Sequence, residues 1–308
     1  MAKKLVWFVT GTSSGFGKAL LNELLNGGHS VIATDRDSSL TDPLQVELEG
    51  KHDTDALKRA YVVKLDITKP DDIKAVFAKA VERFGRIDVV VNNAGYTVIA
   101  EVEACPMDAA RAQFEVMFWG AVHISKEAVR IFREVNPPGE GGHIFNVSSA
   151  GGYSSQPSMA YYSSAKFALE GFTESLRKEM SPEWNIQVTI IEPGGFNTEW
   201  RGKNMTTLPP HPAYDTPNSP TKHYRSMFGA LPFIGLPERA AKAYVALAEK
   251  KNDLPLRIQF GSDSIAVIRH TAMKTISDSE KWESISHSTN IDGIDPQEYT
   301  KNLLAALG

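Results

Sequence analysis

The sequence predicts a single α/β domain in which a doubly wound parallel sheet carries helices on both faces. Short apolar runs rich in valine and isoleucine alternate along the chain with longer segments of helical periodicity. Strands buried on both faces have this continuous apolar character, and helices between them favour parallel pairing. With 308 residues, 42% of them hydrophobic, the chain is long enough to bury one large core.

Each expected strand is a short apolar run. In chain order the strands cover residues 5–10, 30–34, 61–65, 87–91, 143–147, 186–191 and 255–260. The helices between them have their own start and stop signals. The first ends at the glycine pair 27–28, and the second has Pro70 in its first turn and stops at Gly85. The expected helices cover residues 16–26, 70–84, 107–134, 158–180, 237–251, 261–281 and 296–304.

Residues 200–234 break this alternation with prolines that follow no period, which predicts a long irregular loop. Its large side chains either form a wide pocket for a lipophilic substrate or pack against their own domain. These side chains are Trp200, Met205, Leu208, Tyr214, Tyr224, Met227, Phe228, Leu231 and Phe233. We expect residues 1–262, with this loop, to be the catalytic domain, and residues 263–308 to be a C-terminal extension packed on it.

Composition argues against several classes of partner. The net charge of −4 and the pI near 6.1 do not suit nucleic acid or an anionic membrane. A single cysteine, Cys105, cannot form an internal disulfide, and no Cys/His cluster predicts a metal site. The apolar run before Gly11 is too short for a signal peptide or a membrane span. We therefore expect a cytoplasmic protein with no metal.

Three glycines lie in the turn between the first strand and the first helix, in the sequence TGTSSGFG over residues 10–17. Gly11 permits a tight turn, Gly15 lets a pyrophosphate approach the backbone, and Gly17 lets the helix lie close on the sheet. Backbone N–H groups at the helix start then face the anion. The position directly after the first strand indicates a dinucleotide site rather than an ordinary glycine-rich turn.

With this spacing, and with motifs that follow in order, residues 4–262 resemble the short-chain dehydrogenase/reductase family. Each of these motifs follows one of the predicted strands: Asp66-Ile67, Asn92-Asn93-Ala94-Gly95, Ser149, and Pro193-Gly194 with Thr198. The resemblance implies a Rossmann-type fold and an NAD(P)-dependent oxidoreductase that interconverts a ketone and a secondary alcohol. The cofactor contacts that it implies are Gly11, Thr12, Ser14, Gly15, Phe16, Gly17, Asp66, Ile67, Asn93, Ala94, Gly95, Tyr162, Lys166, Pro193 and Thr198.

The chain looks most like the branch of this family that contains 17-beta-hydroxysteroid and retinol dehydrogenases and related microbial oxidoreductases. That likeness implies a bulky lipophilic substrate such as a steroid, retinoid or polyketide. It also implies a homodimer or homotetramer that pairs through the helices at 107–134 and 158–180.

The heptapeptide AYYSSAK, residues 160–166, contains the residues that would carry the chemistry. On a helix, Tyr162 lies roughly 40° from Lys166, whereas Tyr161 lies roughly 140° away, so only Tyr162 shares its face. In the family pattern Tyr162 is the acid/base. Lys166, together with the positive charge of the oxidised nicotinamide, lowers the pKa of the Tyr162 phenol, and Lys166 also holds the nicotinamide ribose. Ser149 donates to the substrate oxygen. Ser148 should point the other way on its strand, and Tyr161 should be a packing residue.

The residues after the second strand give conflicting signals about the cofactor. Asp35 can accept hydrogen bonds from both ribose hydroxyls and would repel a 2′-phosphate. Arg36 could pair with that phosphate, stack on adenine, or be a solvated charge. Ser14 stands where many family members that prefer NADP(H) carry a basic residue. We expect NAD(H) or NADP(H), with NAD(H) preferred.

Met117 departs from the family pattern, which has an asparagine here that helps to hold a proton-relay water. A thioether cannot donate a hydrogen bond. A bypassed relay, a substitute polar group, an engineered change or a loss of redox chemistry would each explain it. Two other functions therefore stay open: a non-redox isomerisation, dehydration or cyclisation on the same fold, and a dinucleotide sensor without turnover.

Overall fold

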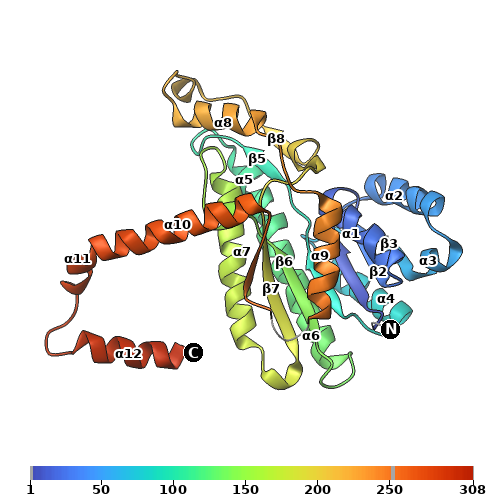
Figure 1. Ribbon diagram of the computed structural model, residues 1–308. Coiled ribbons are helices and arrows are strands. Elements are labelled where there is room, and N and C mark those ends of the chain that lie inside the picture. The colour runs from blue at the N-terminus through green and yellow to red at the C-terminus, as the bar shows by residue number, and fades with distance from the viewer. Residues whose placement is uncertain (1–2, 251–253, 308) are drawn as a thin grey trace. The chain divides into compact units, whose positions relative to one another are not determined.

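The computed structural model describes residues 3–250 and 254–307. The chain divides into two units, Met1–Ile265 and Ala266–Gly308. The first unit is built on a seven-stranded sheet with helices over both faces (Figure 1). All neighbouring strands in this sheet are parallel, which confirms the predicted doubly wound fold.

The strands lie in the order β3-β2-β1-β4-β6-β7-β9. The chain fills one half of the sheet outward from β1 and then crosses to β4 to build the other half. At such a reversal the crossover helices leave in opposite directions, and a crevice opens beyond the carboxyl ends of the strands. The strands are β1 (Val6–Thr10), β2 (Ser30–Asp35), β3 (Ala60–Lys64), β4 (Val89–Asn92), β6 (Gly142–Val147), β7 (Ile186–Pro193) and β9 (Arg257–Phe260).

Helices of the first unit follow these strands. They are α1 (Gly15–Asn26), α2 (Ser38–Lys51), α3 (Thr54–Arg59), α4 (Pro70–Phe84), α5 (Met107–Phe114), α6 (Ala121–Glu134), α7 (Ala160–Glu179), α8 (Pro220–Ala230) and α9 (Pro237–Glu249). The sequence analysis did not predict α2, α3, α8 or the short strand β5 (Thr97–Ile99). The expected end of the fifth helix at residue 251 lies outside the described residues.

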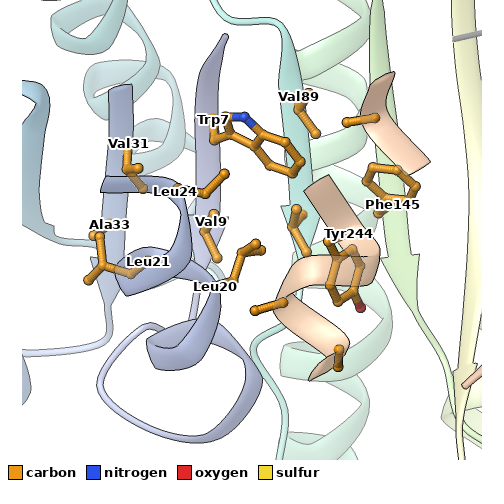
Figure 2. Packing of buried hydrophobic residues seen from close by; sticks show 14 of the residues in the cluster. Trp7, Val9, Leu20, Leu21, Leu24, Val31, Ala33, Val89, Phe145 and Tyr244 are labelled. Atoms are coloured by element: carbon orange, nitrogen blue, oxygen red, sulfur yellow. The ribbon is translucent and has the colours of Figure 1, made fainter. Parts of the chain in front are cut away.

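Alternate residues of β1 supply two separate cores. Trp7 and Val9 pack with side chains of α1 and α9 (Figure 2), and Val6 and Phe8 pack with side chains of α4 and α6. This alternation follows from the period of two along a strand. A central strand that is buried on both faces gives the loops at its carboxyl end a rigid base.

The long helix expected over 107–134 is interrupted. A π-helical turn, Glu115–Gly120, joins α5 to α6. Such turns insert an extra residue into the helix and are frequent at functional sites. Met117 lies within this turn, where its side chain is buried.

The prediction of an irregular loop over 200–234 was wrong for much of that segment. Its second half contains α8, and β8 (Met205–Thr207) pairs in parallel with β5. Pro220 occupies the first turn of α8, where a missing N–H costs nothing, and the Ser219 hydroxyl accepts from the Lys222 N–H. A proline that appears to break a helix from sequence thus starts one.

The second unit contains the C-terminal part of α10 (Ser262–Lys281), together with α11 (Glu283–His287) and α12 (Pro296–Leu307). The helix expected at 296–304 therefore extends three residues further. Packing of the extension on the catalytic domain stays a prediction. Within the described residues, no helix has the length and apolar character needed to cross a bilayer.

Candidate active site

A cleft of about 550 Å³ lies among the loops that follow β1, β2, β4, β6 and β7. Every site residue expected from the sequence lines it except Thr12 and Gly17. Thr12 is buried beside the cleft, and its hydroxyl donates to the Thr34 carbonyl at 3.3 Å. The sequence motifs therefore meet in one place, as the ends of parallel strands require.

The glycine turn has the geometry that its sequence predicts. Gly11 and Gly15 have φ of +69° and +54°, in the left-handed region that favours glycine. A Cβ on Gly17 would lie 2.1 Å from the Gly11 carbonyl oxygen, so α1 could not approach the turn with any larger residue. Gly17 is thus a packing position rather than a lining one.

Asn93 holds this turn against β4. Its side-chain amide donates to the carbonyls of Thr10 and Gly11 at 2.8 and 3.0 Å. In return, the Thr10 hydroxyl accepts from the backbone N–H groups of Asn93 and Ala94. The two loops are therefore fixed relative to each other across the strand-order reversal.

Asp35 is the last residue of β2. In the sheet, β1 and β4 lie between β2 and β6, the strand that precedes Ser149. The two carboxylate oxygens of Asp35 accept from the backbone N–H groups of Ser13 and Arg36, each at 2.9 Å. Arg36 is exposed and pairs with Asp37 at 3.3 Å. The carboxylate is thus fixed, whereas the guanidinium extends into solvent.

Asp66 and Ile67 line the same part of the cleft. Burial opposes ionisation of Asp66, but hydrogen bonds from the Thr68 hydroxyl and backbone N–H hold its pKa below the usual value. Ile67 packs against Gly120, where a Cβ would come within 2.7 Å of its side chain. Both residues also stabilise their own loop.

Tyr162, Ser149 and Lys166 converge at the other end. The Ser149 hydroxyl is hydrogen-bonded to the Tyr162 phenol, and it accepts from the Gly151 N–H at 3.0 Å. Lys166 lies one turn further along α7, is buried, and donates from Nζ to the Val147 carbonyl at 2.7 Å.

The expected lowering of the Tyr162 pKa is not found. Burial raises the pKa of Tyr162 to about 12, and only the Ser149 hydrogen bond opposes this rise. Burial also lowers the pKa of Lys166 to about 8, against the influence of Glu170. The expectation assigned this lowering to Lys166 together with the positive charge of an oxidised nicotinamide, so it stays a prediction for the cofactor-bound enzyme. In the chain alone the Lys166 ammonium donates to the Val147 carbonyl. The chain's own groups hold Tyr162 as a neutral phenol.

The neighbouring side chains lie as predicted. Ser148 points away from Ser149, and its hydroxyl donates to the Glu170 carboxylate at 2.6 Å. Tyr161 packs with Val98 and Cys105, and its hydroxyl donates to the Val102 carbonyl at 3.1 Å. Neither the Ser148 hydroxyl nor the Tyr161 hydroxyl is hydrogen-bonded to Tyr162 or Ser149.

Met117 places a thioether close to Lys166. A Cβ on Gly95 would lie 3.6 Å from the Met117 sulfur and 3.8 Å from Lys166 Nζ, so both groups flank this glycine. Met117 packs in a cluster with Tyr162 and Met159. This side of the lysine is therefore apolar.

Aromatic side chains form the wall beside Tyr162. The Trp200 ring lies 5.6 Å from the Tyr162 ring, and Phe233 lies 6.4 Å beyond Trp200. Trp200 and Phe233 line the cleft, whereas Tyr224 and Phe228 of α8 stack behind them at 5.6 Å. Of the remaining side chains expected to form the pocket, Leu208 packs in the Cys105 cluster, and Met227 and Leu231 are exposed.

Pro193 and Thr198 lie beside the glycine turn, where a Cβ on Gly15 would come within 3.4 Å of Thr198. The sequence analysis missed Asp263, whose carboxylate accepts from the Gly195 N–H at 2.6 Å and braces this loop. It also missed Asn204, whose amide donates to the Ser14 hydroxyl at 3.2 Å. Neither residue belongs to a recognisable motif, so only tertiary structure reveals them.

The residues present fit a dinucleotide. The left-handed glycines leave backbone exposed at the positive end of α1, which suits a pyrophosphate, and the Asp35 carboxylate suits ribose hydroxyls. Within residues 3–250 and 254–307, no group of His, Cys, Asp and Glu side chains is arranged to hold a metal ion.

Comparison with known proteins agrees with this geometry. The family model for short chain dehydrogenases matches residues 5–208. An uncharacterized oxidoreductase of Schizosaccharomyces pombe is 35% identical over 288 residues, which cover 94% of this chain and 92% of that protein. The oxidoreductase BOA17 of Botryotinia fuckeliana is 35% identical over 284 residues, covering 91% and 97%.

A crystal structure of a short-chain dehydrogenase from Streptomyces avermitilis has the same fold over nearly the whole chain. The two superpose with a TM-score of 0.80 and 32% sequence identity, covering 94% of this chain and 99% of that one. The likeness therefore extends beyond the nucleotide-binding half.

Proposed function

The chain belongs to the short-chain dehydrogenase/reductase family and is an oxidoreductase that uses a nicotinamide dinucleotide; we propose that it reduces a bulky lipophilic ketone to its secondary alcohol. The observation that carries this proposal is the Tyr162 phenol, hydrogen-bonded to Ser149 at the foot of an aromatic wall. A neutral phenol at this place is a proton donor.

A reduced nicotinamide bound in this cleft would supply the hydride that the carbonyl carbon accepts. Tyr162 donates its proton to the carbonyl oxygen, and Ser149 donates a hydrogen bond to the same oxygen as negative charge develops there. Lys166, with its pKa lowered to about 8, is a proton source from which the phenolate can recover. Alcohol oxidation is the reverse of each step and needs the phenolate.

The wall chemistry supports a lipophilic substrate. Trp200 and Phe233 present apolar surface to the cleft beside Tyr162, and Met159 and Met205 pack around them. Lys203 also lines the cleft, at the edge near Asn204. Apolar walls with few polar groups favour ring systems or long chains over small charged substrates.

We propose NAD(H) as the preferred cofactor, because both oxygens of Asp35 are fixed by backbone donors and a 2′-phosphate would meet that charge. Replacing Asp35 by serine should tighten NADPH binding relative to NADH by about tenfold or more, since a removed like charge is worth 1.4 kcal/mol or more. Fluorescence titration with both reduced cofactors measures this ratio. An unchanged ratio would contradict the proposed role of Asp35.

A homodimer or homotetramer through α5–α6 and α7 is also proposed. Trp119, in the π-helical turn between α5 and α6, and Phe167, on α7, are 45% and 47% exposed, so this face offers large apolar side chains that a second copy could cover. Sedimentation of a Phe167→Asp variant should show a smaller species than wild type. Location in the cytoplasm remains a prediction.

The test of the reaction is NADH and NADPH oxidation, followed by absorbance, with steroid, retinoid and polyketide-like ketones. We expect oxidation that depends on the ketone. Cofactor binding without oxidation across a wide panel would favour the non-redox or sensor alternatives, which only Met117 supports.

A further inference from the structure

An acidic cluster lies next to Lys166 along α7. Its centre is Glu170, one helical turn along α7 from Lys166 and 4% exposed. Its second member is Glu192 on β7, which is fully buried. The mechanism above uses neither residue, although isolated buried carboxylates are costly.

Hydrogen bonds tie Glu170 directly to the active-site strand. One carboxylate oxygen accepts from the Ser148 hydroxyl at 2.6 Å, and the other accepts from Arg257 Nε at 3.1 Å. A Cβ on Gly152 would lie 2.3 Å from the Ser148 hydroxyl, 2.7 Å from the Glu170 carboxylate and 3.0 Å from Lys166 Cβ. These three side chains therefore meet at one glycine.

Apart from Lys166, a single cation in the described part of the chain forms ion pairs with both buried glutamates. Arg257 is the cation that faces them, with Nε 3.6 Å from Glu192 and Nη2 3.1 Å from the more exposed Glu174. Gln259 donates to the other oxygen of Glu192. Two buried carboxyls that share one arginine favour a state with one proton between them.

The pKa values agree with such sharing. Burial raises the pKa of both Glu170 and Glu192, and the two carboxyls interact directly. Glu170 in turn raises the pKa of Lys166 against the effect of burial. Lys166 has in Glu170 its nearest source of negative charge on α7.

We propose that Glu170 is a positioning residue for the reaction, because its carboxylate stabilises the charged form of the Lys166 amine. A proton that Glu170 shares with Glu192 weakens this stabilisation. This inference rests on the proposed function only for its catalytic consequence. The electrostatic link itself exists whether or not a ketone is turned over.

The direct test is an NMR titration of the Lys166 Cε resonance in ¹³C-lysine-labelled protein, assigned by its loss in Lys166→Met. Replacing Glu170 by glutamine keeps the shape and removes the charge. The Lys166 midpoint should fall by on the order of one pH unit, the effect of one nearby charge at an effective dielectric constant of about 20. Circular dichroism checks that the variant is folded.

Two further variants separate charge from packing. Glu174→Gln removes another Arg257 contact two turns from Lys166, and it should leave the midpoint unchanged. Glu192→Gln should leave the midpoint in place or raise it, because Glu170 then keeps its full charge. An unchanged midpoint in Glu170→Gln, or an equal fall in Glu174→Gln, would overturn the proposal.

Where a ketone is found, the alkaline limb of kcat/KM should move with the NMR midpoint. A protein that turns over no ketone but shows the shifted midpoint would contradict the proposed function and leave the electrostatic link intact. A shifted midpoint with an unmoved pH profile would overturn the positioning role. The two failures are therefore distinct.

Discussion

The ion pair between Glu101 and Arg225 should decide how firmly α8 is held behind the aromatic wall of the cleft. Arg225 Nε and Nη2 each lie 3.0 Å from a different oxygen of Glu101, and Glu101 is 2% exposed. Arg225 also donates to the Leu208 carbonyl at 2.9 Å. On α8 itself only Thr221 is buried, and Tyr224 and Phe228 add aromatic contacts with Trp200 and Phe233, so the ion pair is one of few anchors of this helix.

Replacing Arg225 by methionine would leave the buried Glu101 carboxylate without its cation, with only the His211 backbone N–H, at 3.3 Å, as a donor. Removing one member of a buried pair costs about 3–5 kcal/mol. Because α8 has few other anchors, we expect this cost to appear as local opening rather than global unfolding. Hydrogen exchange in α8 should then become about 10²–10³ times faster, since each 1.4 kcal/mol is a factor of ten.

Hydrogen exchange of peptides that cover α8, read by mass spectrometry, measures this effect. The control is Lys222→Met on the same helix, whose ion pair with Asp215 is exposed on both sides and should be worth less than about 1 kcal/mol. The double variant Glu101→Gln/Arg225→Met should recover most of the protection, because no buried charge remains. Equal exchange in Lys222→Met and Arg225→Met, or no recovery in the double variant, would refute this reasoning.

Two other substitutions test the turn and the relay position. Gly17→Ala should weaken NADH binding at least tenfold and lower the melting temperature, because its Cβ would come 2.1 Å from the Gly11 carbonyl oxygen. The control is Gly50→Ala, where a Cβ would meet no atom within 4 Å. This change should stabilise the fold by about 0.5–1 kcal/mol. A Gly17→Ala protein that binds NADH normally contradicts the close approach. Met117→Asn should raise turnover by restoring a hydrogen-bonding group beside Lys166, and unchanged rates across pH would exclude a relay penalty.

Much of the fold was readable from sequence because buried parallel strands and glycine turns leave strong local signals. The seven strands of the main sheet and the TGTSSGFG turn are examples. By contrast, α2 was missed because its apolar face is weak and Pro43 lies inside it, and α8 was missed because Pro220 at its start follows several other prolines. Local pattern cannot tell a starting proline from a breaking one.

The site was predictable where it depends on spacing and not where it depends on environment. Helical spacing selected Tyr162 over Tyr161, and strand alternation separated Ser148 from Ser149. The upward shift that burial gives the Tyr162 pKa in the chain alone could not be predicted, because burial and the carbonyl partner of Lys166 are properties of the folded chain. Asp263 and Glu170 likewise act through contacts distant in sequence.

The central claim is that the buried Tyr162 phenol donates the proton to the ketone. Comparing Tyr162→Phe with Tyr161→Phe tests it most directly. Single-turnover hydride transfer from NADH to a reactive ketone should fall by at least 10²-fold in Tyr162→Phe, the usual contribution of a general acid, with NADH binding retained. Tyr161→Phe should react like wild type, since its hydroxyl contacts Val102 and Met107, away from the cleft. Undiminished hydride transfer in Tyr162→Phe would contradict the account.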